Sequence, residues 1–183
     1  MSAISKEFMK STIARFRNYK DLGDRSFAQL NDWDFNYQPN DESNSIGTLI
    51  QHLSGNMLSR RTDFLKSDGE KNWRKRDEEF AKNEWSKLQY IELWEKGWDC
   101  LFNTLKTLKK KDLKASVKIR KEPLSVIDAI ERQLSHYAYH VGQIVYIAKI
   151  IKSNNWQTLS IAKGASEAYN KTAKIKDPAQ KFR

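Results

Sequence analysis

Apolar residues recur three and four positions apart in four long stretches of the chain. This spacing places the apolar side chains of each stretch on one face of an α-helix. The four predicted helices cover about residues 5–30, 45–66, 83–109 and 124–152. The third stretch is the most regular, with apolar residues at Ile91, Trp94, Trp98, Leu101, Leu105 and Leu108. Because four such helices can bury one shared core, the pattern predicts an all-α, antiparallel, up-down-up-down four-helix bundle.

Polar residues at the ends of these stretches predict where the helices begin. Ser45 and Asn83 are suitable N-caps for the second and third helices. Ser125 and Asp128 have the spacing of a capping box at the start of the fourth helix. Polar and apolar residues alternate within segment 112–123, which allows a short strand or an extended link before that helix.

The connectors and the C-terminal part are more polar than the helices. Segment 70–82 is strongly charged, and we expect Trp73 and Phe80 to fix it to the helices. Since 183 residues suffice for one well-buried core but not readily for two, we predict a single domain over residues 1–183 with an irregular C-terminal segment. Three apolar residues of that segment are expected to pack back onto the helices: Trp156, Leu159 and Ile161.

The chain carries an excess of positive charge, with 33 Lys and Arg against 23 Asp and Glu and a formal net charge of +10. One interpretation is a nucleic acid or another acidic partner. The other is a basic but ordinary surface, because much of the excess lies in segments 109–121 and 163–183 and not along one helix face. We favour the second interpretation and expect no nucleic-acid partner.

Composition also predicts where the protein is located. Cys100 is the only cysteine, so no internal disulfide can form. The first ten residues contain charges where a signal peptide would be apolar, and the most apolar run, 141–151, is too short to span a membrane. We therefore expect a cytoplasmic protein without a membrane partner.

The fourth predicted helix contains the main candidate for chemistry. One of its faces is apolar at both ends but polar in the middle, where Gln133, His136, His140 and Gln143 follow one another. Unpaired polar groups on a buried face cost about 1–3 kcal/mol each, so these residues need partners. His136 and His140 lie one helical turn apart, which allows two imidazoles to bind one metal ion. Such a pair can also be a hydrogen-bonded pair without a metal.

The third histidine, His52, lies in the middle of the second predicted helix. If the second and fourth helices meet across the core, His52, His136 and His140 provide three ligands for one divalent ion. The remaining coordination positions would take water or substrate, as in catalytic metal sites. These three histidines are the only ones in the chain, which favours the metal-site hypothesis.

Three polar residues near the histidines are candidates for supporting roles. Asn56, one turn after His52, either lines the cavity or binds water. Gln143 either orients a ligand imidazole or a bound water, or faces solvent. Arg60, two turns after His52, could hold an acidic group of a cofactor, although such a residue is more often a solvated helix arginine.

Two segments resemble the DinB-like superfamily, which includes bacillithiol transferases and mycothiol-dependent maleylpyruvate isomerases. The sequence S-I-G-T-L-I-Q-H-L at 45–53 is similar to its second helix, and H-Y-A-Y-H-V-G-Q-I at 136–144 is similar to its fourth. Segments 67–77 and 159–164 resemble a largely uncharacterised bacterial branch. The resemblance implies a four-helix bundle with nickel, zinc or iron bound by the histidine triad, and a homodimer. It also implies transfer of a low-molecular-weight thiol to a small-molecule electrophile.

Three functions follow from these observations. The first is a divalent-metal-dependent enzyme similar to thiol S-transferases, or a hydrolase that activates water at the same site. The second is a metal-containing bundle without catalytic activity that binds a small molecule or a protein. The third, supported by charge alone, is a basic nucleic-acid-binding protein.

Overall fold

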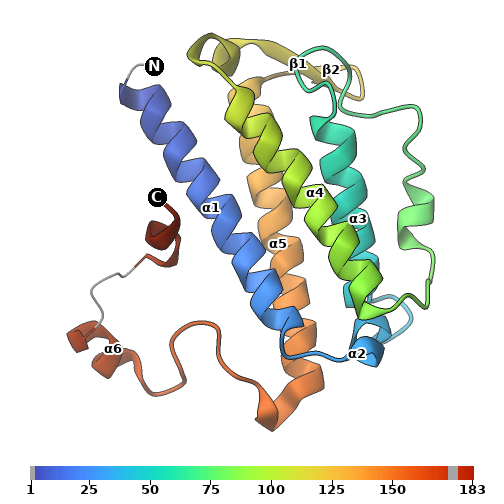
Figure 1. Cartoon of the computed structure of the whole chain (residues 1–183), viewed down its shortest axis with the longest axis vertical. Helices are drawn as coiled ribbons and strands as arrows, with labels where there is room; N and C mark the ends of the chain where they lie inside the picture. Colours follow the sequence, from blue (N-terminus) through green and yellow to red (C-terminus); the bar gives the residue numbers. More distant parts are fainter. Residues whose placement is uncertain (1–2, 173–176) are drawn as a thin grey trace.

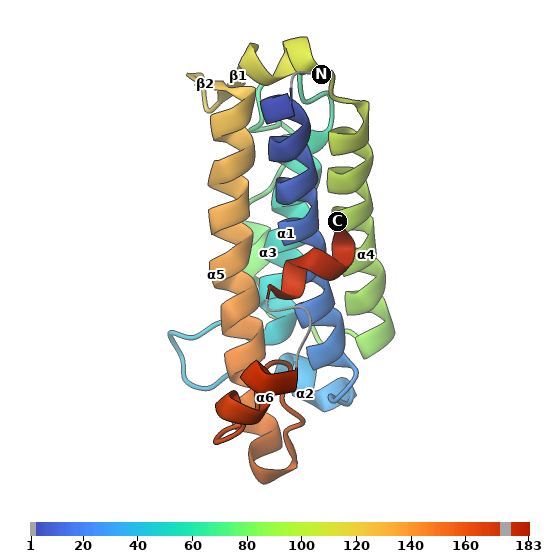
Figure 2. The same cartoon turned by 90° about the vertical axis from the view of Figure 1, so that its left-hand side faces the viewer.

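The computed structural model describes residues 3–172 and 177–183, and this part of the chain is mostly helical. Four long helices lie side by side: α1 (Ala3–Phe27), α3 (Ile46–Arg61), α4 (Lys87–Thr107) and α5 (Val126–Lys152) (Figures 1 and 2). The all-α class is therefore confirmed. Shorter helices are α2 (Asp32–Asn36), α6 (Ser166–Thr172), and the 3₁₀ segments η1 (Asp77–Phe80), η2 (Lys110–Lys114), η3 (Ser153–Asn155) and η4 (Pro178–Phe182).

The helix directions differ from the predicted up-down-up-down order. Ser54 Oγ donates to the carbonyl of Leu93, and Thr104 Oγ1 contacts the carbonyl of Arg61, so residue numbers rise together along α3 and α4. These two helices are parallel, and the prediction of alternating directions is wrong. The cause is segment 62–86, which returns along the length of the helices before α4 begins (Figure 1). Only short connections force neighbouring helices to be antiparallel.

Helix α3 ends and helix α5 begins at the end of the structure that carries the β-hairpin, so this pair is antiparallel, and it carries the histidines (Figure 1). His52 of α3 lies beside His136 of α5, and the Tyr137 hydroxyl donates to Asn56 Oδ1 at 3.1 Å. Behind this pair α1, α4 and α5 share a cluster of aromatic side chains. Trp98 has ring contacts with Trp94, Phe16 and Tyr137, at centroid distances of 5.3, 6.3 and 5.9 Å. The core therefore fixes α5 firmly against its neighbours.

Capping residues set the helix starts largely as expected. Ser45 caps α3 and Ser125 caps α5, since each hydroxyl accepts a backbone N–H three residues later. Asn83 does not cap α4, contrary to the prediction. Ser86 does so, in a capping box with Gln89. Helix α4 therefore starts later than predicted, and the Asn83 side chain instead donates its Nδ2 to Gln51 Oε1 at 2.6 Å.

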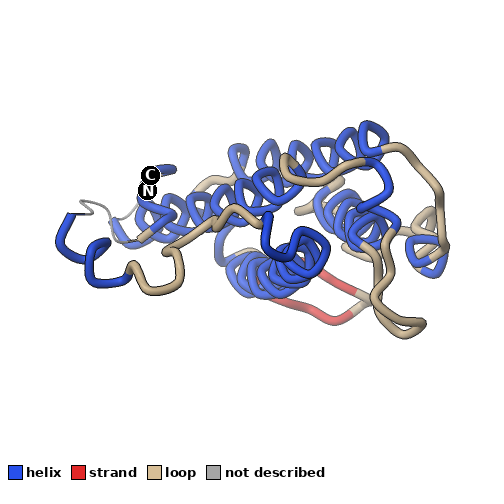
Figure 3. Tube along the Cα trace, turned by 90° about the horizontal axis from the view of Figure 1, so that it is seen from below, coloured by secondary structure: helices blue, strands red, loops and turns tan. Residues whose placement is uncertain are grey.

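A β-hairpin closes the end of the structure where α3 and α4 finish. Strands β1 (Ser116–Ile119) and β2 (Glu122–Ser125) are antiparallel, which confirms the predicted short strand (Figure 3). Arg120 and Lys121 form the turn with positive φ angles of 54° and 69°. The Asp68 carboxylate accepts both of their backbone N–H groups, at 2.8 and 2.7 Å. The connector after α3 is thereby tied to the segment that leads into α5.

The segment after α5 is only partly irregular. Trp156 packs against the core, but Ile161 is 41% exposed, so the packing predicted for Ile161 is wrong. η4 lies against α1, where Asp177 pairs with Arg15 and Lys181 pairs with Asp21. Among the helices of residues 3–172 and 177–183, none combines the length and the apolar character required to cross a membrane.

Candidate metal centre

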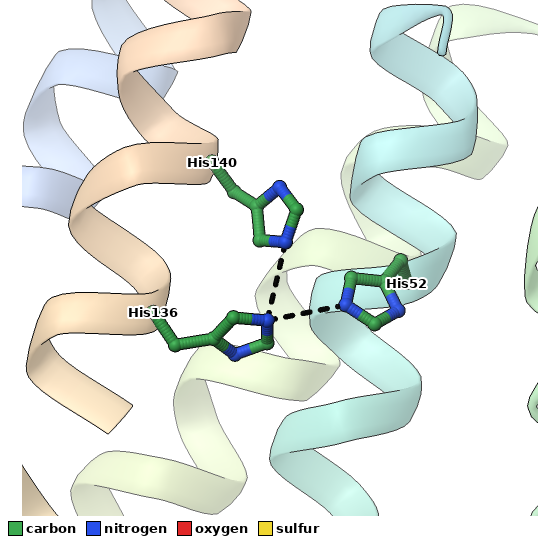
Figure 4. Close-up of side chains that lie close together, drawn as sticks. All are labelled: His52, His136 and His140. Atoms are coloured by element: carbon green, nitrogen blue, oxygen red, sulfur yellow. Dashed lines mark hydrogen bonds between the residues drawn. The ribbon is translucent and has the colours of Figure 1, made fainter. Parts of the chain in front are cut away.

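The three histidines converge between α3 and α5 (Figure 4). His136 Nε2 lies 3.3 Å from His52 Nε2 and 3.1 Å from His140 Nε2. One nitrogen from each ring lies within 4.8 Å of the others. His52 and His140 are 5% and 7% exposed, and His136 is partly buried. The helical spacing of His136 and His140 and the packing of α3 against α5 together bring these groups to one point.

Hydrogen bonds on the opposite side of two rings determine which nitrogen faces the centre. His52 Nδ1 donates to Glu79 Oε2 at 3.0 Å, and His140 Nδ1 donates to Gln143 Oε1 at 2.7 Å. An ionised carboxylate only accepts hydrogen bonds, so the proton of His52 lies on Nδ1 and its Nε2 presents a lone pair. His140 has the same arrangement. Two lone pairs therefore point toward His136 Nε2.

This arrangement fits a divalent metal ion. Imidazole nitrogens bind zinc at about 2.0–2.1 Å, which places two ligands of a tetrahedral ion about 3.3–3.4 Å apart. The observed separations of 3.1 and 3.3 Å are close to that value. Without a cation the facing lone pairs repel one another, and His136 Nε2 can donate one proton at most. The three-histidine cluster could thus hold a metal ion.

The protonation states of the histidines also suit metal binding. Burial, together with the nearby His140 and His52, lowers the pKa of His136 to about 3. Burial likewise lowers the pKa of His140 to about 4, against the opposing effect of the Gln143 hydrogen bond. Both rings are therefore neutral at neutral pH, which is the form that binds metals.

Residues 3–165 match the family described as "Protein of unknown function (DUF1572)". The chain belongs to the DUF1572 family. DUF1572 is a DinB-like family, so the resemblance seen in the sequence is confirmed at that level. The three histidines, Glu79 and Gln143 all lie within the matched residues. No curated protein and no solved structure shows a significant match to the chain.

Glu79 is the residue of this DUF1572 site that sequence reasoning missed. Its carboxylate contacts His52 and also accepts from Arg74, at 2.7 and 2.8 Å. Burial acts to raise the pKa of Glu79, but the hydrogen bonds from His52 and Arg74 outweigh it and the pKa lies below its ordinary value. Glu79 belongs to the charged segment 70–82, where no periodicity distinguishes it from Glu78. The sequence contains one indirect signal, which is a glycine in the middle of a helix. Gly55 of α3 leaves room for Glu79, because a β-carbon there would lie 2.2 Å from Glu79 Oε1.

The same segment contributes an aromatic residue to the site. Phe80 lies with its ring centroid 4.9 Å from that of His52, so Phe80 does pack against α3 as predicted. Trp73 is 56% exposed, and its predicted role in fixing the segment is wrong. The buried ion pair between Arg74 and Glu79 anchors the segment in its place.

The three candidate supporting residues lie near the histidines in different ways. Gln143 contacts His140 directly. Asn56 is buried, accepts from Tyr137 and lines the cavity beside the histidines. Arg60 is also buried in the cavity wall, where it donates to the Gly69 carbonyl and to Glu70. The expectation that Arg60 is a solvated helix arginine is therefore wrong.

A cavity of about 320 Å³ opens directly in front of the three histidines. Its volume lies in the range of pockets that hold small molecules. The cluster contains no Cys, Asp or Glu ligand among the described residues. A metal ion bound there would have three protein ligands and would face the cavity, which is the arrangement of catalytic sites and not of structural ones.

Proposed function

We propose that this protein is a divalent-metal-dependent enzyme with His52, His136 and His140 as ligands of nickel, zinc or iron. The observation that carries the proposal is the convergence of three buried imidazole nitrogens at a cavity large enough for a small-molecule substrate. When bound, a divalent ion would lower the pKa of a thiol or water beside it and so supply a nucleophile at neutral pH.

The residues of the chain would position the reactants. Glu79 and Gln143 hold the rings of His52 and His140 in one orientation, so the cluster needs little rearrangement on binding. Asn56 and Phe80 line the cavity next to the histidines and would contact the substrate. The sequence resembles the thiol transferases of the DinB-like superfamily, so we propose transfer of a low-molecular-weight thiol to an electrophile. We further propose that the chain forms a single DinB-like four-helix-bundle domain. The parallel pair of α3 and α4, with its long connector, would be part of that bundle.

Metal analysis tests the proposal. We expect one divalent ion per chain in protein reconstituted with zinc or nickel and then desalted, and loss of that ion in His136→Ala. Ser135→Ala changes the neighbouring exposed residue and should keep the ion. Equal metal content in His136→Ala and unaltered protein would refute the metal site.

A turnover assay separates the enzyme from a metal-containing bundle without catalytic activity. With cysteine or coenzyme A as thiol donor and an aryl halide as electrophile, thioether formation and halide release should depend on the metal. A full complement of metal without turnover across a broad panel of thiols and electrophiles would favour the alternative function.

A homodimer and a cytoplasmic location stay predictions. A nucleic-acid partner is disfavoured, because the arginines beside the histidines line a cavity of small-molecule size.

A further inference from the structure

The cavity beside the histidines is unusually rich in arginine. Five arginines line it, and no Asp or Glu is among the described lining residues. The arginines come from four segments that are distant in the sequence: Arg60 from α3, Arg74 and Arg76 from segment 62–86, Arg120 from the hairpin, and Arg132 from α5. The basic character that the sequence spreads over loops and helices is thus concentrated by the fold at one site.

Two carboxylates behind the cavity wall compensate only part of this charge. Glu70 contacts Arg60, Arg74 and Arg120, at 3.1, 3.4 and 3.0 Å. Glu79 contacts Arg74. Asp77 approaches Arg76 only to 3.9 Å and is fully exposed, so it contributes little. Five guanidinium groups against Glu70, Glu79 and the nearby Asp68 still leave a positive excess before a divalent ion is added.

Four of the five arginines divide into two groups by their contacts, and Arg120 is intermediate, because it is exposed but pairs with Glu70. Arg60 and Arg74 are buried and committed to carboxylate and carbonyl partners, so they shape the wall. Arg132 and Arg76 are exposed at the cavity. Arg132 makes no hydrogen bond or ion pair with another described residue, and it lies one helical turn before His136, on the same side of α5. The guanidinium of Arg132 is therefore available to a ligand in the cavity.

Gln133 gives an independent indication of a ligand. The residue is 3% exposed and lines the cavity, and its Oε1 has no hydrogen-bond partner among the described residues. A buried acceptor without a partner costs about 1–3 kcal/mol. This oxygen has almost no accessible surface, so the Gln133 side chain would turn toward the cavity to accept from a hydroxyl or N–H group of a ligand.

The spacing along α3 indicates an elongated ligand. His52 and Arg60 are eight residues apart on one face of the helix, which corresponds to about 12 Å. Arg60 therefore lies about two turns from His52 along α3, whereas Arg132 lies one turn from His136 along α5. A molecule that reacts at the histidines would place its other end among the guanidinium groups.

We propose that the substrate of this site is a small organic anion with carboxylate or phosphate groups, bound through Arg132 and Arg76 with Arg120 beside them. The inference rests on the proposed function, since it names the substrate class of the same centre. Guanidinium groups bind both kinds of acidic group through paired hydrogen bonds, and the charge excess described above favours an anion over a neutral or cationic molecule.

Equilibrium binding to metal-loaded protein tests the proposal, with succinate, inorganic phosphate and the neutral analogue succinamide as probes. We expect saturable binding of succinate or phosphate and none of succinamide. The double variant Arg76→Gln/Arg132→Gln should bind the anion about tenfold more weakly, because two solvent-exposed charge contacts are lost. Arg17→Gln removes a similar charge from the exposed surface of α1 and should leave the affinity unchanged. The tighter of the two anions identifies the preferred acidic group.

The outcomes separate this inference from the metal proposal. Normal metal content with no saturable anion binding, or equal binding by the double variant and the Arg17→Gln control, would overturn the inference alone. Loss of metal in His136→Ala with anion binding retained would support both proposals, since the arginines bind the anion independently. If His136→Ala keeps its metal while the double variant loses anion affinity, the metal proposal fails and the anion site stands.

Discussion

Glu79 holds His52 from a segment far along the chain, with its Oε2 3.0 Å from His52 Nδ1. The carboxylate is itself fixed by the guanidinium of Arg74, whose side chain is 2% exposed. A carboxylate in this position sets the tautomer and raises the basicity of a metal-binding imidazole. The connector between α3 and α4 is therefore part of the candidate site and not only a link between helices.

The first prediction concerns this contact. Glu79→Gln removes the charge but nearly preserves the shape, and we expect the affinity for zinc to fall about 10- to 100-fold. Competition with a chelating dye measures the change. Glu78→Gln is the matched control, because Glu78 is exposed and its one ion pair among the described residues is with Lys75. Equal zinc affinity in the two variants would show that Glu79 does not support His52.

The second prediction concerns Gly55, which lies one turn after His52. A β-carbon at this position would lie 2.2 Å from Glu79 Oε1, so Gly55→Ala must displace the carboxylate. We expect a weaker zinc site and a lower melting temperature, although alanine usually stabilises a helix by about 0.5–1 kcal/mol relative to glycine. In α5, Gly142 has open space around its α-carbon, so Gly142→Ala should be neutral or stabilising. A stabilising effect of both changes would contradict the close packing of Glu79 on α3.

The third prediction compares two adjacent arginines at the end of α3. Arg61 is 2% exposed, and none of its guanidinium nitrogens has a hydrogen-bond partner among the described residues, although the group lies 4.6 Å from the Phe64 ring centroid. Burial lowers the pKa of Arg61. Because a buried charge without a carboxylate partner is costly, Arg61→Met should raise the free energy of unfolding, by about 1–4 kcal/mol.

The neighbouring substitution should have the opposite effect. Arg60→Met would remove the Arg60 hydrogen bonds to Glu70 and to the Gly69 carbonyl, although Arg74 and Arg120 still contact Glu70 and Ser59 still donates to Gly69. We expect the free energy of unfolding to fall by about 1–3 kcal/mol. Chemical denaturation at neutral pH measures both variants. The interpretation of Arg61 fails if its substitution is as destabilising as that of Arg60.

The fourth prediction concerns pH and the tie between Asp68 and the hairpin. Partial burial acts to raise the pKa of Asp68, but the N–H groups of Glu70, Lys121 and Arg120 lower it below the ordinary value of 3.8. A lowered pKa in the folded state means that ionised Asp68 stabilises the protein above the unfolded-state pKa. This contribution is lost as the pH falls through the lower pKa of the folded state.

The free energy of unfolding, measured as a function of pH, checks that ionised Asp68 stabilises the folded protein. At pH 7, Asp68→Asn should lower the free energy of unfolding by about 1–2 kcal/mol, and the difference from unaltered protein should shrink below about pH 4. Asp77→Asn changes a fully exposed carboxylate and should have no measurable effect. A difference between Asp68→Asn and unaltered protein that is constant from pH 7 to pH 2 would contradict the role of the Asp68 charge.

Several features of the protein were predictable from sequence because they depend on neighbours along the chain. Apolar spacing gave the four long helices, and hydroxyl side chains at Ser45 and Ser125 gave two of their starts. The spacing of His136 and His140 places both on one face of α5 by helical geometry alone. The predicted start of α4 at Asn83 was wrong because Ser86 offers the reciprocal capping partner Gln89.

Sequence alone determined the helical class of this protein, the histidine pair on α5 and the position of His52 on a second helix, because periodicity and capping act over one or two helical turns. The tertiary structure decided that α3 and α4 are parallel, that Glu79 orients His52, and that arginines from four segments share one cavity. These relationships join residues far apart in the chain. The positions of those residues depend on how the connector 62–86 and the hairpin pack against α3 and α5. No local pattern encodes such packing, since it results from burial and charge pairing across the whole molecule.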